Sequence, residues 1–152
     1  MTTTTTPLVG PRVIGLAHYA SRAVLERALA PHGIDFLQSV TLRLTVVADG
    51  PVERAGLAAE VVDTVKVAEA DAQRTIDTLA AVGLISVEEP SLVRVTAAGR
   101  ELYATTSAAT APISARIYAG ISEEDRAVAG RVLALITERA NAELAALSTQ
   151  NS

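Results

Sequence analysis

The residues best suited to chemistry lie near the start of the chain. His18, Tyr19 and Arg22 share one expected helix, and Arg43 lies in the next. An imidazole exchanges a proton near neutral pH, a tyrosine hydroxyl donates or accepts, and a guanidinium grips a carboxylate through two hydrogen bonds. We expect these four residues to line a cleft for a small acidic aromatic ligand. The alternative is that Tyr19 packs at a subunit interface and His18 faces solvent.

Other chemistries lack the residues they need. The chain has no cysteine, so disulfides, thiolate chemistry and cysteine-bound zinc are excluded. Its two histidines, His18 and His32, are too few and too far apart in sequence for a His-x-x-x-His metal site. No nucleophile motif surrounds Ser21 or Ser39, and the segment 10–15 contains a proline unsuited to a phosphate loop. We therefore expect no catalytic residue, no metal and no cofactor.

Helical periodicity organises the first third of the chain. Apolar residues recur at three- and four-residue spacing over 12–32, and Gly33 is expected to end that helix. Asp35 is the expected N-cap of a second helix, whose apolar stripe is Phe36, Val40, Leu44 and Val47. Residues 1–11, with their threonine run, show no periodicity, and we expect a flexible tail without a secretory signal.

Shorter elements follow. Two short helices are expected over 54–64 and 68–82, separated by a turn at 65–67. Strands at 84–87 and 92–95, with a tip at 88–91, predict a β-hairpin. Thr96 is expected to cap a long helix reaching about residue 118 and bent near Pro112, and Ser122 to cap the last helix.

This order of elements predicts a mainly α fold with a small β-hairpin wing. The winged helix-turn-helix lobe covers about 51–96, within a single domain of residues 12–152. The outer helices, about 12–32 and 97–147, are too apolar for the lobe to cover, so we expect them to be dimerisation helices of a C2 homodimer. No stretch approaches the roughly 18 apolar residues of a membrane span. We expect a cytoplasmic protein with no membrane partner.

Four segments carry a family resemblance, in order and at matching spacing. They are Leu29–Ile34 with Phe36–Leu37, Gly56–Val67, Ala72–Ile85 and Val93–Arg100. The chain resembles the MarR family of ligand-responsive transcriptional regulators in these segments. In order, they are similar to the start of that family's second helix, to its first helix-turn-helix helix with the following turn, to its recognition helix with the first wing strand, and to the start of its fifth helix. The resemblance covers about residues 12–147.

The resemblance implies a triangular dimer with interleaved outer helices. Recognition helices of such dimers enter successive major grooves of a double-stranded DNA operator, roughly 34 Å apart. Small, often phenolic or carboxylated effectors bind between the dimer helices and the lobe and release the DNA. In this chain the implied DNA-binding residues are Gln73 as the base reader and, around it, Arg54, Lys66, Arg74 and Arg94.

Three features depart from the family pattern. The wing tip, 88–91, is short and lacks the usual Asp-x-Arg pair. The recognition helix begins Ala68-Glu69-Ala70-Asp71, whose acids favour the helix dipole but oppose a polyanion. Residues 51–96 contain four bases and eight acids, so this lobe carries a net charge of −4, equal to that of the whole chain. Such a charge disfavours binding to phosphates.

Three functions therefore remain in view. The first is a homodimeric, ligand-responsive DNA-binding regulator. The second is a MarR-like scaffold that has lost DNA binding and uses its dimer cleft to bind or transform a small molecule, with His18 as a proton-transfer group. Between a regulator and an enzyme, we favour the regulator. A protein-interaction module, whose acidic lobe meets a basic partner, ranks third.

Overall fold

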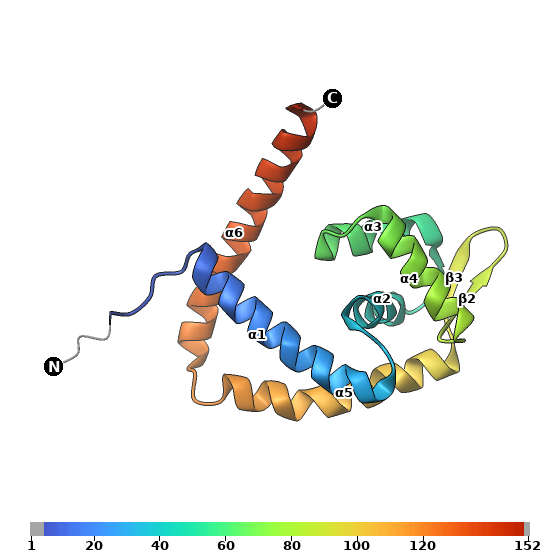
Figure 1. Ribbon diagram of the computed structural model, residues 1–152, viewed down its shortest axis with the longest axis horizontal. Helices are drawn as coiled ribbons and strands as arrows, with labels where there is room; N and C mark the ends of the chain where they lie inside the picture. The colour runs from blue at the N-terminus through green and yellow to red at the C-terminus, as the bar shows by residue number, and fades with distance from the viewer. Residues whose placement is uncertain (1–4, 151–152) are drawn as a thin grey trace. The chain divides into compact units, whose positions relative to one another are not determined.

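The computed structural model describes residues 5–150 and is mainly helical, with a small antiparallel sheet (Figure 1). In chain order the elements are α1 (Pro11–Leu29), the 3-10 helix η1 (Ala30–His32), α2 (Phe36–Val47), β1 (Val52–Glu53), α3 (Arg54–Val65), α4 (Glu69–Ala81), β2 (Ile85–Glu88), β3 (Leu92–Val95), α5 (Ala97–Tyr118) and α6 (Glu123–Gln150). The predicted fold class is confirmed. Of the tail predicted for residues 1–11, residues 5–10 form neither helix nor strand, Pro11 already begins α1, and residues 1–4 lie outside the described part.

The chain divides into two compact units after Pro112. Pro112 lies inside α5, where its ring removes one backbone donor from the helix. The C-terminal unit holds the end of α5 and the long helix α6. Ser122 caps α6 as predicted, because its Oγ accepts a hydrogen bond from the Asp125 N–H at 3.1 Å. No helix of residues 5–150 combines the length and the apolar character that crossing a membrane requires.

Helix α2 is central to the N-terminal unit. It packs against α1, α3, α4 and β3, and Figure 1 shows it nearly end-on between α1 and the α3–α4 pair. The core around it consists of side chains with almost no exposed surface, among them Leu42, Leu57, Val61, Ile76 and Leu79. Burying each of these side chains contributes roughly 1.5–3 kcal/mol. This core fixes α3 and α4 against each other.

The apolar stripe predicted for α2 is partly wrong. Val47 is 68% exposed, whereas Thr41 and Thr45 are fully buried. Their hydroxyls donate to the carbonyls of Leu37 and Thr41, each at 2.9 Å, so no polar atom is left without a partner. A threonine whose hydroxyl bonds back along its own helix presents its methyl group to the core. The buried face of α2 is therefore rotated from the one that hydropathy alone predicts.

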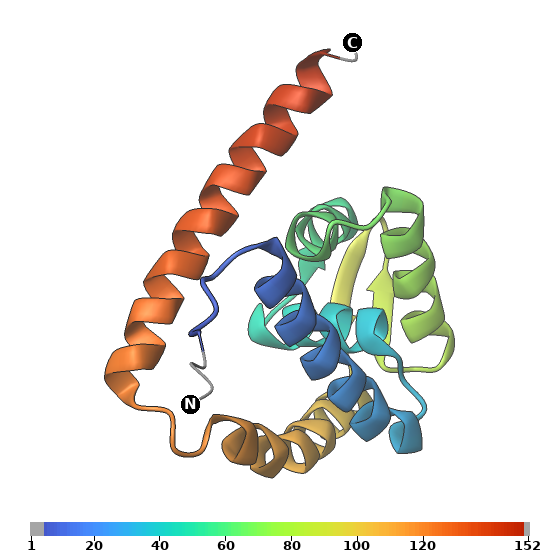
Figure 2. The same ribbon diagram turned by 60° about the vertical axis from the view of Figure 1, so that its left-hand side comes forward.

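The wing contains three strands instead of the predicted two. The sheet order is β1-β3-β2, and β1 pairs antiparallel with β3 through Val52 opposite Val93. Strands β2 and β3 lie side by side as the expected hairpin (Figure 2). In their register Ile85 is opposite Val95. The strand β1 leads directly into α3, because Arg54, the first residue of α3, follows Glu53, the last residue of β1. The Arg54 backbone N–H also donates to the Ser91 carbonyl at 2.8 Å. The wing is therefore joined to the first helix of the helix-turn-helix.

Specific caps fix where two helices begin. The Asp35 carboxylate accepts from the Gln38 N–H at 2.8 Å, and the Gln38 side chain accepts from the Asp35 N–H at 2.9 Å, which completes a capping box. At the start of α5, the Thr96 hydroxyl donates to the Gly83 carbonyl at 2.6 Å and accepts from the Gly99 N–H at 3.1 Å. Both caps were predicted, and the link to Gly83 ties α5 to the turn after α4.

Candidate functional site

Helices α3 and α4 meet at a tight turn whose hinge is Lys66. Lys66 adopts the left-handed conformation, with φ of 56°, and its N–H donates to the Val62 carbonyl at 2.8 Å. Leu57 and Val61 of α3 and Ile76 of α4 belong to the same buried core. The predicted helix-turn-helix is therefore present, and the wing follows it in the chain.

Arg54, the first residue of α3, connects the two helices through Gln73. Its Nε donates to Gln73 Oε1 at 2.7 Å, and its Nη2 donates to the Gln73 backbone carbonyl at 3.3 Å and to Asp77 Oδ1 at 2.7 Å. The Arg54 side chain is only 26% exposed. Two of the five predicted DNA-binding residues are thus brought together, and they bind each other.

The other three basic residues of the lobe also form ion pairs with acidic residues. These pairs are Lys66–Asp63, Arg74–Asp71 and Arg94–Glu88. All three are exposed to solvent, and an exposed ion pair contributes about 0.2–1 kcal/mol to stability. The pairs therefore orient the three basic side chains but are weak enough to be exchanged for contacts with phosphate.

The remaining acids of the lobe carry its negative charge. Four of the eight pair with the four bases, and among residues 5–150 the other four make no ion pair: Glu53, Glu60, Glu69 and Glu89. Glu53 accepts a hydrogen bond from the Ser91 hydroxyl at 2.7 Å, so one acid is fixed beside the wing tip. Arg94 lies on β3 and not in the tip segment 88–91, as the sequence indicates.

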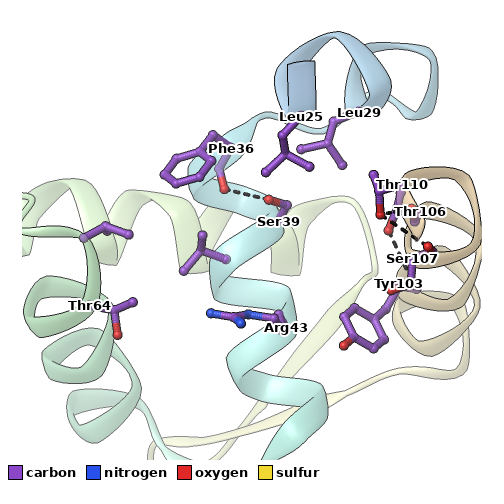
Figure 3. Close-up of a pocket in the computed structure, with 12 residues that line it drawn as sticks. Leu25, Leu29, Phe36, Ser39, Arg43, Thr64, Tyr103, Thr106, Ser107 and Thr110 are labelled. Atoms are coloured by element: carbon purple, nitrogen blue, oxygen red, sulfur yellow. Dashed lines mark hydrogen bonds between the residues drawn. The ribbon is translucent and has the colours of Figure 1, made fainter. Parts of the chain in front are cut away.

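A second candidate site is a pocket of about 400 Å³ in the N-terminal unit (Figure 3). Its lining comes from α1, α2, α3 and α5: Leu25, Leu29, Phe36, Ser39, Val40, Arg43, Thr64, Val65, Tyr103, Thr106, Ser107 and Thr110. This volume falls in the range that holds small-molecule ligands. The mixture of an apolar wall with hydroxyl groups and one cation suits an amphipathic ligand.

Arg43 supplies the positive charge of this pocket. In Figure 3 its guanidinium extends from α2 on the side of Thr64, and Tyr103 lies on the side of α5. Within residues 5–150 Arg43 makes no ion pair or hydrogen bond, unlike every base of the lobe. A guanidinium in this state is available to a carboxylate.

The other predicted ligand-binding residues lie outside the pocket lining. His18 and Tyr19 form an edge-on ring pair with centroids 5.6 Å apart, and Tyr19 is 69% exposed. Arg22 pairs with Glu26 at 2.8 Å, and its guanidinium lies over the Phe36 ring, 4.4 Å from the centroid. The structure therefore brings only Arg43 of the four into this pocket.

Sequence reasoning missed the polar wall that α5 contributes. Tyr103, Thr106, Ser107 and Thr110 lie at helical spacing in a segment without any motif. That polar stripe at positions three and four apart was the available signal. Among the described residues no group of three or more histidine, aspartate or glutamate side chains is placed to hold a metal ion.

Helix-turn-helix and wing together make this chain a winged helix-turn-helix protein. Neither models of known families nor curated proteins match the sequence. Solved structures do match, and they give the fold more narrowly: it is the winged-helix fold of MarR-family regulators.

Three of these structures are informative. A MarR-family regulator from Rhodococcus sp. RHA1 superposes with a TM-score of 0.71 at 20% identity, over 82% of this chain and 91% of its own. CouR from Rhodococcus jostii RHA1, bound to p-coumaroyl-CoA, gives 0.70 at 20% identity over 82% and 88%. A MarR mutant from E. coli, complexed with operator DNA, gives 0.69 at 17% identity over 82% and 91%.

Proposed function

We propose that this chain acts in the cytoplasm as a homodimeric DNA-binding transcriptional regulator whose DNA affinity responds to a small ligand. The observation that carries the proposal is the helix-turn-helix of α3 and α4, which leaves the outer face of α4 exposed beside a wing. A structure of the same fold, the E. coli MarR mutant, is complexed with operator DNA, which supports this use of the lobe.

The proposed DNA contacts follow from the positions of Gln73 and of the basic residues of the lobe. Gln73 and Arg74 lie on α4, with Gln73 as the base reader and Arg74 beside it as a phosphate contact, and Lys66 lies at the preceding turn. Arg54 and Arg94 flank them on α3 and β3. Since each exposed ion pair is weak, a phosphate oxygen can replace the carboxylate partner of Arg74, Lys66 or Arg94.

We expect the exposed apolar surface to be buried in a homodimer. The C-terminal unit exposes many large aliphatic side chains along α6, among them Val128, Val132, Leu135, Ile136 and Leu144. Apolar surface of this extent is unusual on a protein that works as a monomer. A second copy would cover it and would set two recognition helices about 34 Å apart.

The effector proposed for the pocket is a small carboxylated aromatic molecule. Leu25, Leu29 and Phe36 provide apolar contact, and the guanidinium of Arg43 provides the partner for a carboxylate. CouR, which has the same fold, is bound to p-coumaroyl-CoA. The participation of His18, Tyr19 and Arg22 in ligand binding stays a prediction.

The test is binding of labelled DNA from upstream of the chain's own gene, followed by fluorescence anisotropy over a salt series. We expect sequence-selective binding that resists competitor DNA and weakens steeply with salt. Arg74→Ala should lower the affinity and reduce the salt slope by about one. Arg27→Ala, which removes an exposed arginine from the last turn of α1, is the matched control and should change neither.

One observation favours a second candidate, a ligand-binding scaffold without DNA function. All four bases of the lobe pair with acids, and the lobe keeps a net charge of −4. This candidate predicts ligand binding in the Arg43 pocket together with no DNA binding even at low salt. That combination would overturn the regulator proposal.

A further inference from the structure

Gln73 is the residue of α4 proposed to read a base, and the structure restricts how it can do so. A glutamine amide normally offers both an acceptor oxygen and a donor NH₂ group. With both atoms side by side it makes a bidentate contact with adenine, accepting from N6 and donating to N7. The contact therefore requires that oxygen and nitrogen both face the base.

Arg54 occupies one of the two lone pairs of that oxygen and competes with adenine for it. Its Nε donates to Gln73 Oε1 at 2.7 Å, and the same guanidinium is anchored by the Gln73 backbone carbonyl at 3.3 Å and by Asp77 Oδ1 at 2.7 Å. A guanidinium has donors and no acceptor, so the amide atom that it faces must be the oxygen. Gln73 is held with its oxygen toward Arg54, and no residue within 5–150 accepts a hydrogen bond from its NH₂ group.

We propose that Arg54 is a specificity-determining residue that holds Gln73 as a hydrogen-bond donor, so that Gln73 reads guanine in place of adenine. Guanine presents two acceptors in the major groove, N7 and O6, which match the two N–H bonds of the amide. Adenine presents one acceptor beside an amino group that would face another donor. The inference rests on the proposed DNA-binding function and specifies which base that function selects.

Selection of bound sequences from a randomised duplex library, with the full-length protein, tests the inference. Loss of preference in Gln73→Ala identifies the base position that Gln73 reads. The wild-type protein should prefer guanine there, and Arg54→Met, which frees the amide oxygen, should shift the preference toward adenine by about tenfold. Arg27→Met is the matched control and should keep guanine.

A second variant keeps Arg54 in place. Gln73→Glu retains an oxygen for the guanidinium but has no donor, so guanine should be lost and cytosine, whose N4 donates, gained. An altered base at one position is a readout that mere destabilisation of the lobe would not give. Thermal unfolding of each variant confirms that it is folded before selection.

The outcomes separate the inference from the function beneath it. If the wild-type protein enriches no sequence at low salt, the DNA-binding function fails and the inference falls with it. If it enriches a sequence but prefers adenine at the Gln73 position, or if Arg54→Met leaves the preference unchanged, the function stands and the inference is overturned.

Discussion

Asp71 lies three residues before Arg74 on α4, and its carboxylate accepts a hydrogen bond from the Arg74 guanidinium. The Arg74 side chain is 70% exposed and that of Asp71 41%, so both face solvent. The pair places a carboxylate and a guanidinium together near the start of α4, the proposed recognition helix. In the absence of DNA, the guanidinium that could contact a phosphate is therefore already bound to a carboxylate one helical turn away.

Replacing that competitor should strengthen DNA binding. Asp71→Asn removes one negative charge and releases Arg74, so we expect the affinity to rise roughly threefold to tenfold and the salt slope to steepen by up to about one. Fluorescence anisotropy over a salt series measures both quantities. Glu101→Gln makes the same charge change on α5 and should have a much smaller effect. An unchanged affinity in Asp71→Asn would mean that Arg74 does not contact DNA.

Replacing Lys66 by glycine should raise the stability of the protein and lower its affinity for DNA. Its left-handed backbone suits glycine, so Lys66→Gly should stabilise the protein by about 0.5–1 kcal/mol, reduced by loss of the exposed pair with Asp63. The same variant should bind DNA more weakly, since a predicted phosphate contact is gone. Urea unfolding and anisotropy measure the two effects. Lys66→Ala keeps the backbone strain and should weaken DNA binding without any gain in stability.

Gly99 should tolerate no side chain. A Cβ there would lie far inside van der Waals contact with the Leu84 carbonyl and would press on Val95 Cγ2. We expect Gly99→Ala to lower the free energy of unfolding by about 2–3 kcal/mol. Gly56→Ala is the matched control, because the site in α3 has open space and helical backbone, and it should raise stability by about 0.5–1 kcal/mol. Equal stabilities of the two variants at one protein concentration would contradict the packing of α5 on Leu84.

The charge of Arg43 should decide which ligands bind in the pocket. Arg43→Met keeps an unbranched, flexible side chain, shorter than that of arginine, and removes the guanidinium, so benzoate-type acids should bind about tenfold more weakly or worse. The corresponding neutral amides should bind both proteins equally. Isothermal titration calorimetry measures each affinity, and Arg27→Met should behave as wild type. If acids and amides bind the wild-type protein alike, the pocket does not use Arg43 to select a carboxylate.

Elements with local signals could be predicted from the sequence. Asp35, Thr96 and Ser122 cap helices as their residue types indicate, and Lys66 lies in the turn expected at 65–67. Strand β1 was missed because two residues show no alternation, and it exists only through pairing with β3. The buried Thr45 was missed because hydropathy does not show that its hydroxyl bonds along the helix.

Sites assembled over long sequence distances were less predictable. Asp71 and Arg74 are three residues apart on an expected helix, a spacing from which pairing follows. The contacts of Arg54 with Gln73 and Asp77 span nineteen and twenty-three residues and depend on the packing of α3 against α4. The pocket likewise draws on four helices, so the sequence singled out Arg43, which lines it, but not the residues of α5 that line it too.

The wall of the pocket and the hinge of the helix-turn-helix are consecutive in the chain. Thr64 and Val65 line the pocket, and the next residue, Lys66, is the left-handed C-cap of α3 at the turn into α4. A ligand that presses on the last turn of α3 would therefore act, across a single peptide bond, on the turn that precedes α4, the proposed DNA-reading helix. On this geometry the bulk of the ligand beside Thr64, as well as its charge, would decide whether it is an effector or a silent occupant.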